Sequence, residues 1–78
     1  MAERETIHEI TKHFGTLSGN DSTISMELNL VSWAENRPVY DLRRWKNKED
    51  GDKIPLRGLV LKIDELKKLK KLLQEMEL

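Results

Sequence analysis

The stretch ELNLVSWAENRPVYDLRRWK, residues 27–46, decides the fold that this sequence predicts. It indicates two β-strands joined by a tight turn at Glu35-Asn36-Arg37-Pro38, because residues typical of turns interrupt two runs of alternating side chains. Side chains on a strand point alternately to the two faces of a sheet. The even-numbered face then carries Leu28, Leu30, Tyr40 and Leu42, and the odd-numbered face carries Asn29, Val31, Trp33, Val39, Asp41, Arg43 and Trp45.

The positions of the apolar residues predict how the two strands pair. A three-residue turn at Glu35 to Arg37 pairs Trp33 with Val39 and Leu30 with Leu42, so that apolar residues meet on the even face. A slip of one residue would turn the leucines of one strand toward water. We therefore expect the even face to be the core, covered by a C-terminal helix, and the odd face with both tryptophans to be open.

Two further strands and a helix are expected around this hairpin. Residues 6–17 are rich in β-branched and aromatic side chains, which favours a strand with a bulge near Gly15, and a helix over residues 8–13 is the competing interpretation. Leucines after Ile63 recur at helical spacing. The predicted elements are strands over residues 6–17, 24–33, 39–46 and 57–62, a turn at 18–22, a charged loop at 47–55 and a helix from 63 to about 76.

The predicted fold class is α+β, a single domain with a four-stranded curved antiparallel sheet over residues 6–62 and one α-helix over residues 63–77. The chain has 78 residues and no cysteine, so neither a disulfide framework nor a thiolate metal site is available to stabilise it. A domain of this length buries little surface by itself. We therefore expect it to form a homodimer.

The composition and the motifs also argue against several classes of function. The formal net charge is zero, which argues against a protein whose whole surface binds polyanions. No phosphate-binding glycine loop or nucleophile motif is present, and His8 and His13 lack further ligands at metal-binding spacing. We expect no enzymatic activity, no metal and no cofactor. The sequence shows no signal peptide and no apolar run of membrane length, which predicts a soluble cytoplasmic protein with no membrane partner.

The candidate binding site is the odd face of the hairpin. Flat aromatic side chains on an open sheet can stack on unpaired bases, and a guanidinium can pair with a phosphate. Trp33, Arg43 and Trp45 therefore form the predicted centre of the site, and the basic residues expected at its rim are Arg37, Lys46, Lys53 and Arg57. By strict alternation Arg57 falls on the wrong face, so it reaches the site only from a strand end or a bulge. The alternative is that the tryptophans are buried in a dimer interface or under the long charged loop.

The order of these segments resembles a known family. The matching residues are Glu27-Leu28-Asn29, Val31-Ser32-Trp33, Tyr40-Asp41-Leu42-Arg43 with Trp45, and Arg57-Gly58-Leu59 before the helix. They are similar to the single-strand-binding domain of the transcriptional coactivator positive cofactor four, and most of all to its small bacterial relatives of the YdbC type. The chain departs from that family where a lysine usually precedes the glycine, at Arg57, and at Lys62, where a helix-capping serine or asparagine is typical.

The resemblance implies a curved sheet, a homodimer paired through the C-terminal helices, and largely sequence-independent binding of single-stranded DNA or RNA. By position in that family, Trp33 matches a stacking aromatic, Trp45 an aromatic at a strand end and Arg43 the arginine after the aspartate. We expect Trp33 and Trp45 to stack on bases, and the residues expected to neutralise phosphates are Arg43, Arg37, Lys46 and Arg57. We therefore expect a non-enzymatic single-strand-binding protein of the transcriptional coactivator type. The alternative is a protein-interaction or dimerisation module whose tryptophan face docks a partner.

Overall fold

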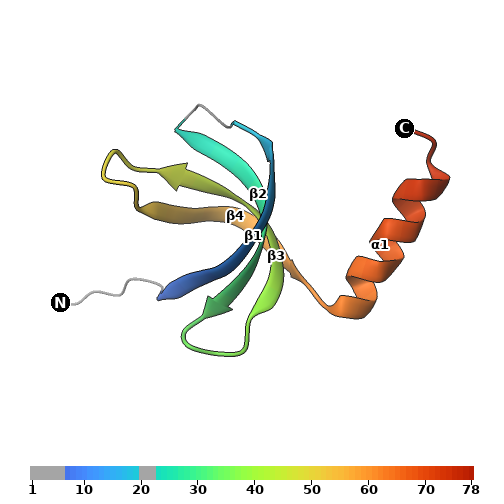
Figure 1. Cartoon of the computed structure of the whole chain (residues 1–78), viewed down its shortest axis with the longest axis horizontal. Coiled ribbons are helices and arrows are strands. Elements are labelled where there is room, and N and C mark those ends of the chain that lie inside the picture. Colours follow the sequence, from blue (N-terminus) through green and yellow to red (C-terminus); the bar gives the residue numbers. More distant parts are fainter. Residues whose placement is uncertain (1–6, 20–22) are drawn as a thin grey trace.

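The computed structural model describes residues 7–19 and 23–78. These residues form a four-stranded antiparallel sheet, in which strands adjacent in sequence are adjacent in the sheet, followed by one helix (Figure 1). The elements in chain order are β1 (His8–Ser18), β2 (Ile24–Trp33), β3 (Val39–Asn47), β4 (Lys53–Leu61) and α1 (Ile63–Glu75). The predicted α+β fold class and the predicted order of elements are confirmed.

The β2–β3 hairpin keeps the predicted faces but not the predicted register. Leu28 pairs with Leu42 and Val31 pairs with Val39, so each partner is displaced by two residues from the expected pairing. Tyr40 accordingly lies opposite Leu30. Because an even shift keeps every side chain on its own face, the assignment of residues to faces survives the error.

The cause of the shift is the turn. Ala34 and Glu35 adopt φ angles of 51° and 64°. The amide of Asn36 donates to the carbonyl of Trp33 at 2.9 Å. Two consecutive positive φ angles closed by this hydrogen bond make a type I′ turn, whose twist matches that of the flanking strands. Such turns usually carry Asn-Gly, so Ala-Glu gives no sequence signal for one, and the sequence favours a later turn.

β1 is irregular along its pairing with β2. The register shifts between Ile10 and Lys12, between His13 and Gly15, and between Thr16 and Ser18. The second shift is the bulge predicted near Gly15, and the strand prevails over the competing helix. Bulges bend a strand and increase its twist. The predicted strand start at residue 6 and part of the predicted turn at residues 18–22 lie outside the described residues.

β4 begins at Lys53, four residues before the predicted start at Arg57, and the charged loop is correspondingly shorter. Gly51, with φ of 94°, closes this loop by donating its amide to the carbonyl of Lys48 at 3.0 Å. In the sequence, Pro55 argues against a strand. β4 pairs only with β3 and is an edge strand, where a residue without an N–H group is tolerated.

A bulge in β4 brings this strand close to β3. Arg43 pairs with Gly58 and Trp45 pairs with Pro55, so β4 fits one extra residue between these pairs. A Cβ atom added to Gly58 would lie 1.9 Å from Cβ of Arg43 and 2.7 Å from the carbonyl oxygen of Leu42. Only glycine fits here, because its backbone packs directly against the neighbouring strand.

The core lies on the odd face, so the expectation that the even face is the core is wrong. The buried residues are Ser25, Glu27, Asn29, Val31, Asp41 and Trp45. On the even face, Leu28, Leu30 and Leu42 remain partly exposed. The reason is the strong curvature of the sheet (Figure 1), whose concave side is the odd face with its buried side chains.

The helix stands away from the sheet (Figure 1). None of its residues is buried, and Leu72 and Leu73 are each 46% exposed, so in the single chain it does not cover the even face as expected. The radius of gyration is 13.9 Å, against about 11.5 Å for a compact chain of this length. The helix begins after Lys62, whose amide donates to Oε1 of Glu65 at 2.8 Å, the half of a capping box that the third helical residue supplies.

Candidate functional site

The curved sheet gathers both tryptophans into one aromatic cluster with His8. Trp33 ends β2 and Trp45 lies toward the far end of β3, yet their ring centroids are 6.2 Å apart and their planes differ by only 4°. The ring of His8, at the start of β1, lies 5.7 Å from Trp33 and 5.1 Å from Trp45. Both tryptophans therefore lie on the same face of the sheet, as the alternation of side chains predicts.

The exposure of the cluster differs from the expectation of an open face. Trp45 is completely buried, and Trp33 is partly buried at the margin of the cluster. Trp45 offers no free face on which a base could stack in this conformation. Among the described residues, three buried side-chain nitrogens have no hydrogen-bond partner: Nδ1 of His8, Nε1 of Trp33 and Nε1 of Trp45. Leaving a buried donor unpaired costs about 1–3 kcal/mol.

Arg43 is held in place by its neighbours. Its Nε and Nη2 donate to the two carboxylate oxygens of the buried Asp41 at 2.7 and 2.8 Å, and Nη1 donates to the carbonyl of Leu56 at 3.0 Å. The guanidinium carbon lies 4.7 Å from the centre of the Trp33 ring, within the range of a cation–π contact. These bonds use three of the five guanidinium N–H groups. Two remain for a ligand, and Asp41 balances the charge.

The rim residues are placed less uniformly than the sequence suggests. Arg37, in the β2–β3 loop, and Arg57, at the bulge of β4, are exposed. The bulge that Arg57 requires is present in β4, between Pro55 and Gly58. Lys46 pairs with Ile24 and Ile54 on the even face, so it lies on the opposite side of the sheet from Trp33. The ammonium group of Lys53 already donates hydrogen bonds to Glu27 and Asn47.

Two open grooves border the aromatic cluster and share Pro55. The first has a volume of about 420 Å³ and is lined by Trp33, Arg43, Pro55, Leu56 and Val60. The second, of about 700 Å³, lies between the start of β1 and the start of β4, and is lined by Ile7, His8, Lys48, Asp52, Lys53, Ile54 and Pro55. The first groove combines an aromatic ring, a guanidinium and apolar side chains.

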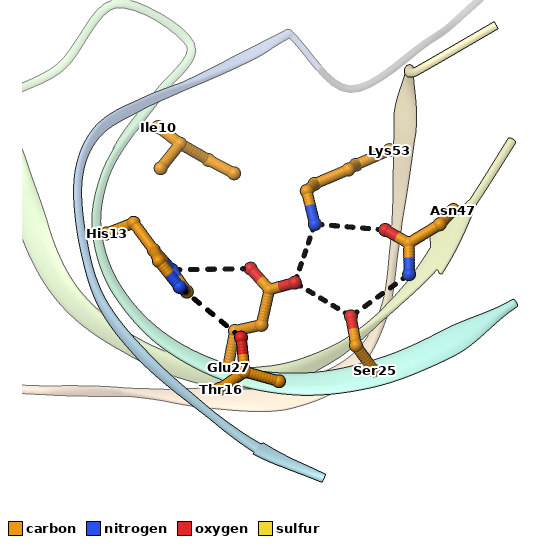
Figure 2. Close-up of a pocket in the computed structure, with 7 residues that line it drawn as sticks. All are labelled: Ile10, His13, Thr16, Ser25, Glu27, Asn47 and Lys53. Atoms are coloured by element: carbon orange, nitrogen blue, oxygen red, sulfur yellow. Dashed lines mark hydrogen bonds and ion pairs between the residues drawn. The ribbon is translucent and has the colours of Figure 1, made fainter. Parts of the chain in front are cut away.

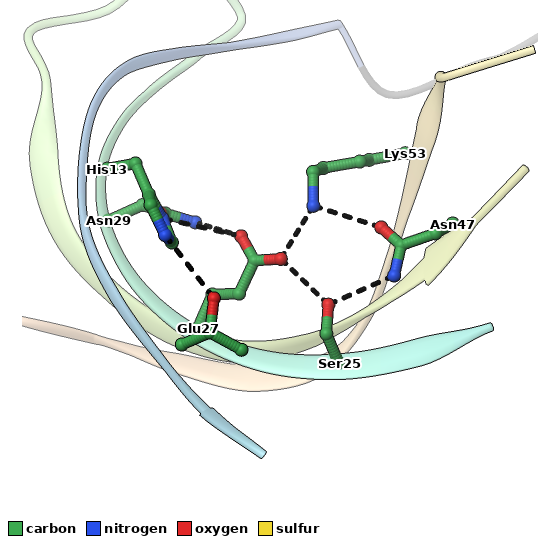
Figure 3. A network of polar contacts seen from close by, with 7 residues as sticks. His13, Ser25, Glu27, Asn29, Asn47 and Lys53 are labelled. Carbon is green, nitrogen blue, oxygen red and sulfur yellow. Dashed lines mark hydrogen bonds and ion pairs between the residues drawn. The ribbon is translucent and has the colours of Figure 1, made fainter. Parts of the chain in front are cut away.

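A polar network occupies the other part of the concave face (Figure 2). Its centre is the buried Glu27, whose Oε2 accepts hydrogen bonds from Lys53 Nζ at 2.6 Å and from Ser25 Oγ at 2.7 Å. Asn29 Nδ2 donates to Oε1 at 3.2 Å (Figure 3). Lys53 Nζ also donates to Asn47 Oδ1 at 2.9 Å. The ammonium group of Lys53, predicted at the binding rim, is thus part of the internal packing.

The network fixes the charge of Glu27. Burial favours the neutral acid and so acts to raise the pKa of Glu27. The hydrogen bonds from Lys53, Ser25 and Asn29, with the positive charge of Lys53, outweigh burial and hold the pKa below its ordinary value.

The network also crosses the sheet. His13 Nδ1 donates to Asn29 Oδ1 at 2.6 Å and brings β1 into contact with the same cluster. The network therefore joins all four strands.

Sequence reasoning missed this network, although a signal for it exists. Ser25, Glu27 and Asn29 alternate along β2 on the same face as Trp33. A strand with three polar residues on one face is normally interpreted as facing solvent on that side. The structure shows instead that the curved sheet encloses these side chains.

The described residues contain neither a metal-binding cluster nor a membrane-spanning helix. Within residues 7–19 and 23–78, no three His, Cys, Asp or Glu side chains come together in a way that could hold a metal ion. In that same part of the chain, no helix has the length and apolarity needed to cross a membrane.

Similarity to a known protein places the chain in a family. No protein-family model matches the chain. The chain is 35% identical over 71 residues to an uncharacterized protein of Treponema pallidum (strain Nichols), in an alignment that covers 91% of this chain and 80% of that protein. An identity of this size over nearly the whole chain shows common descent, and the chain belongs to the same protein family as this Treponema protein.

Proposed function

We propose that this chain binds single-stranded DNA or RNA, tolerates many sequences, and acts without catalysis. The observation that carries the proposal is the groove of about 420 Å³ in which Trp33 lies beside Arg43. An aromatic surface next to a guanidinium is a common way of holding an unpaired base and its phosphate. The resemblance of about residues 24–76 to the positive cofactor four family supports the same conclusion.

The residues in this site have different roles. Trp33 contacts the base from within the groove, which the apolar Leu56 and Val60 also line. Arg43 is oriented by Asp41 and contacts the strand through its two remaining N–H groups. The buried Trp45 packs beside Trp33, with the two ring centroids 6.2 Å apart.

Phosphate contacts are few in this proposal. Arg57 adjoins Leu56 of the groove, and Arg37 follows Trp33 in the β2–β3 loop; both are exposed. Lys46 lies on the other face, and Lys53 would have to leave Glu27 in order to bind a phosphate. Three arginine contacts predict a slope of log K against log salt of about −2, since each single-strand phosphate contributes about −0.7.

Tryptophan fluorescence tests the proposal directly, because both tryptophans of the chain belong to the cluster. Titration with a thymidine oligonucleotide at low salt should change the emission, and a duplex of the same length should bind more weakly. Equal affinity for both, or no change of emission with either, would refute single-strand binding.

Variants of exposed arginine give a second test. Arg57→Gln should weaken binding and reduce the salt slope by about 0.7. The matched control is Lys71→Gln, which removes an exposed charge from α1. An equal effect of the two substitutions would mean that Arg57 makes no specific contact.

We also propose that the chain forms a homodimer through α1 and the even face of the sheet. A groove of about 460 Å³ separates the helix from Leu28, and its apolar lining comes from Leu28, Ile63, Leu66, Leu69 and Leu73. A helix of 13 residues is marginal in water without packing. A second copy would cover both the helix and the leucines of the sheet.

Sedimentation equilibrium tests the dimer. The wild-type chain should sediment as a dimer at micromolar concentration, and Leu69→Glu should shift it toward monomer. Lys71→Glu, on the exposed side of the same helix, should leave the dimer intact. A monomeric wild-type chain at 100 μM would contradict this part of the proposal.

The second candidate function is docking of a protein partner. It is favoured by the exposure of Leu56 and Val60, which are 36% and 46% exposed beside Trp33. A partner bound there would contact mostly apolar surface, so its affinity should change little with salt, and oligonucleotides should not affect the tryptophan emission.

A further inference from the structure

The three unpaired nitrogens of the aromatic cluster are unusual within the concave face. The buried polar side chains Glu27, Asn29 and Asp41 all have hydrogen-bond partners. The indole nitrogens of Trp33 and Trp45 and Nδ1 of His8 have none among the described residues. Buried polar groups are normally paired, so a group of three unpaired ones indicates a place where a ligand supplies the missing partners.

The three rings form one compact cluster. The ring of His8 is within 5.7 Å of both tryptophan rings, and the two indoles are nearly parallel. An indole nitrogen can only donate a hydrogen bond, whereas Nδ1 of histidine donates or accepts according to its tautomer. The cluster therefore offers two fixed donors and one adjustable nitrogen.

The cluster can be reached between the two edges of the sheet. The groove of about 700 Å³ between the starts of β1 and β4 contains His8 and borders Pro55. Pro55 lies opposite Trp45 in the ladder. β1 and β4 are at opposite ends of the strand order and do not pair. Because no ladder joins these two edges, widening the groove between them breaks no backbone pairing.

We propose that one unpaired thymine or uracil enters between β1 and β4 and accepts hydrogen bonds from the indole N–H groups of Trp33 and Trp45. This inference rests on the proposed single-strand binding and adds a base preference at one position. The pairing edge of thymine and uracil has a carbonyl on each side of an N–H group, which Nδ1 of His8 accepts. The pairing edge of adenine has a single acceptor, N1, so adenine cannot satisfy both indoles.

Two-dimensional ¹H–¹⁵N spectra of the full chain test this inference. The chain has two tryptophans and should give two indole cross-peaks. With a thymidine oligonucleotide both indole protons should move downfield and exchange more slowly with solvent. An adenosine oligonucleotide of equal length should bind at least tenfold more weakly and leave the indole peaks nearly unmoved.

Trp33→Phe keeps an aromatic ring and removes one donor, so it should abolish most of the preference for thymidine. The remaining indole peak of Trp45 reports whether the variant is folded. Tyr40→Phe is the control, because Tyr40 stacks on Phe14 at 6.0 Å on the even face and should keep the preference.

The outcomes separate this inference from the function on which it rests. Shifts of backbone amides around the groove with unmoved indole peaks, or equal affinity for the two oligonucleotides, would overturn the base preference and leave single-strand binding standing. No shift with either oligonucleotide would overturn both.

Discussion

Replacing Gly58 with alanine should destabilise the sheet severely for such a small change. The added Cβ would lie 1.9 Å from Cβ of Arg43, 2.6 Å from its Cα and 2.7 Å from the carbonyl oxygen of Leu42. The nearest atoms belong to the backbone or the base of a side chain, so β4 must move away from β3 by more than an ångström. Overpacking of this kind costs about 1–3 kcal/mol, and the backbone contact places Gly58→Ala at about 3 kcal/mol, the upper end of that range.

Urea denaturation and thermal melting measure this cost. For a domain of this size, a loss of about 3 kcal/mol corresponds to a fall in Tm of about 12–24 °C. Gly15→Ala is the matched control, because an added Cβ there meets nothing within 4 Å, and it should change the stability by less than about 0.5 kcal/mol. If the two variants were equally stable, the close approach of β4 to β3 at Arg43 would be refuted.

Three further predictions follow from individual side chains. Glu35 has φ of 64°, so Glu35→Gly should raise the free energy of unfolding by about 0.5–1 kcal/mol; an unchanged or lower urea midpoint would contradict the type I′ turn. The pKa of Glu27 is lowered in the folded protein, so its carboxylate stabilises the fold above the pKa of the unfolded chain, and this contribution is lost as the pH falls through the lower folded pKa. Urea unfolding of wild type and Glu27→Gln at pH 7 should therefore show a gap that closes in acid, and a gap independent of pH would argue against a charged Glu27. Lys53→Met removes the partner of a buried carboxylate and should cost about 2 kcal/mol at pH 7; in a double-mutant cycle, most of this loss should disappear in the Glu27→Gln background.

The parts of the fold that follow from local pattern could be predicted from the sequence. The alternation along residues 27–46 identifies both central strands, and the leucine spacing after Ile63 identifies the helix. The start of β4 could not be predicted, because Pro55 indicates a loop unless it is known that the strand lies at an edge. The register was similarly hidden, since Ala34 and Glu35 adopt a left-handed conformation that their side chains do not favour.

The site shows a different limit. Alternation places Trp33, Arg43 and Trp45 on one face, which the structure confirms, but it carries no information on how strongly the sheet bends. Curvature decides that Trp45 is buried and that Lys53 reaches Glu27. These contacts join strands that are distant in sequence, so no local pattern reports them.

The interruptions in β1 and β4 restrict how this protein can associate with itself. A free sheet edge is a template on which another chain can add a strand, and growth in this way leads to fibres. The register of β1 shifts repeatedly, and β4 contains Pro55 followed by a bulge. Neither edge therefore presents a long regular row of free N–H and C=O groups. The sheet should stop at four strands even at high concentration, which leaves its faces and its helix as the surfaces through which copies can meet.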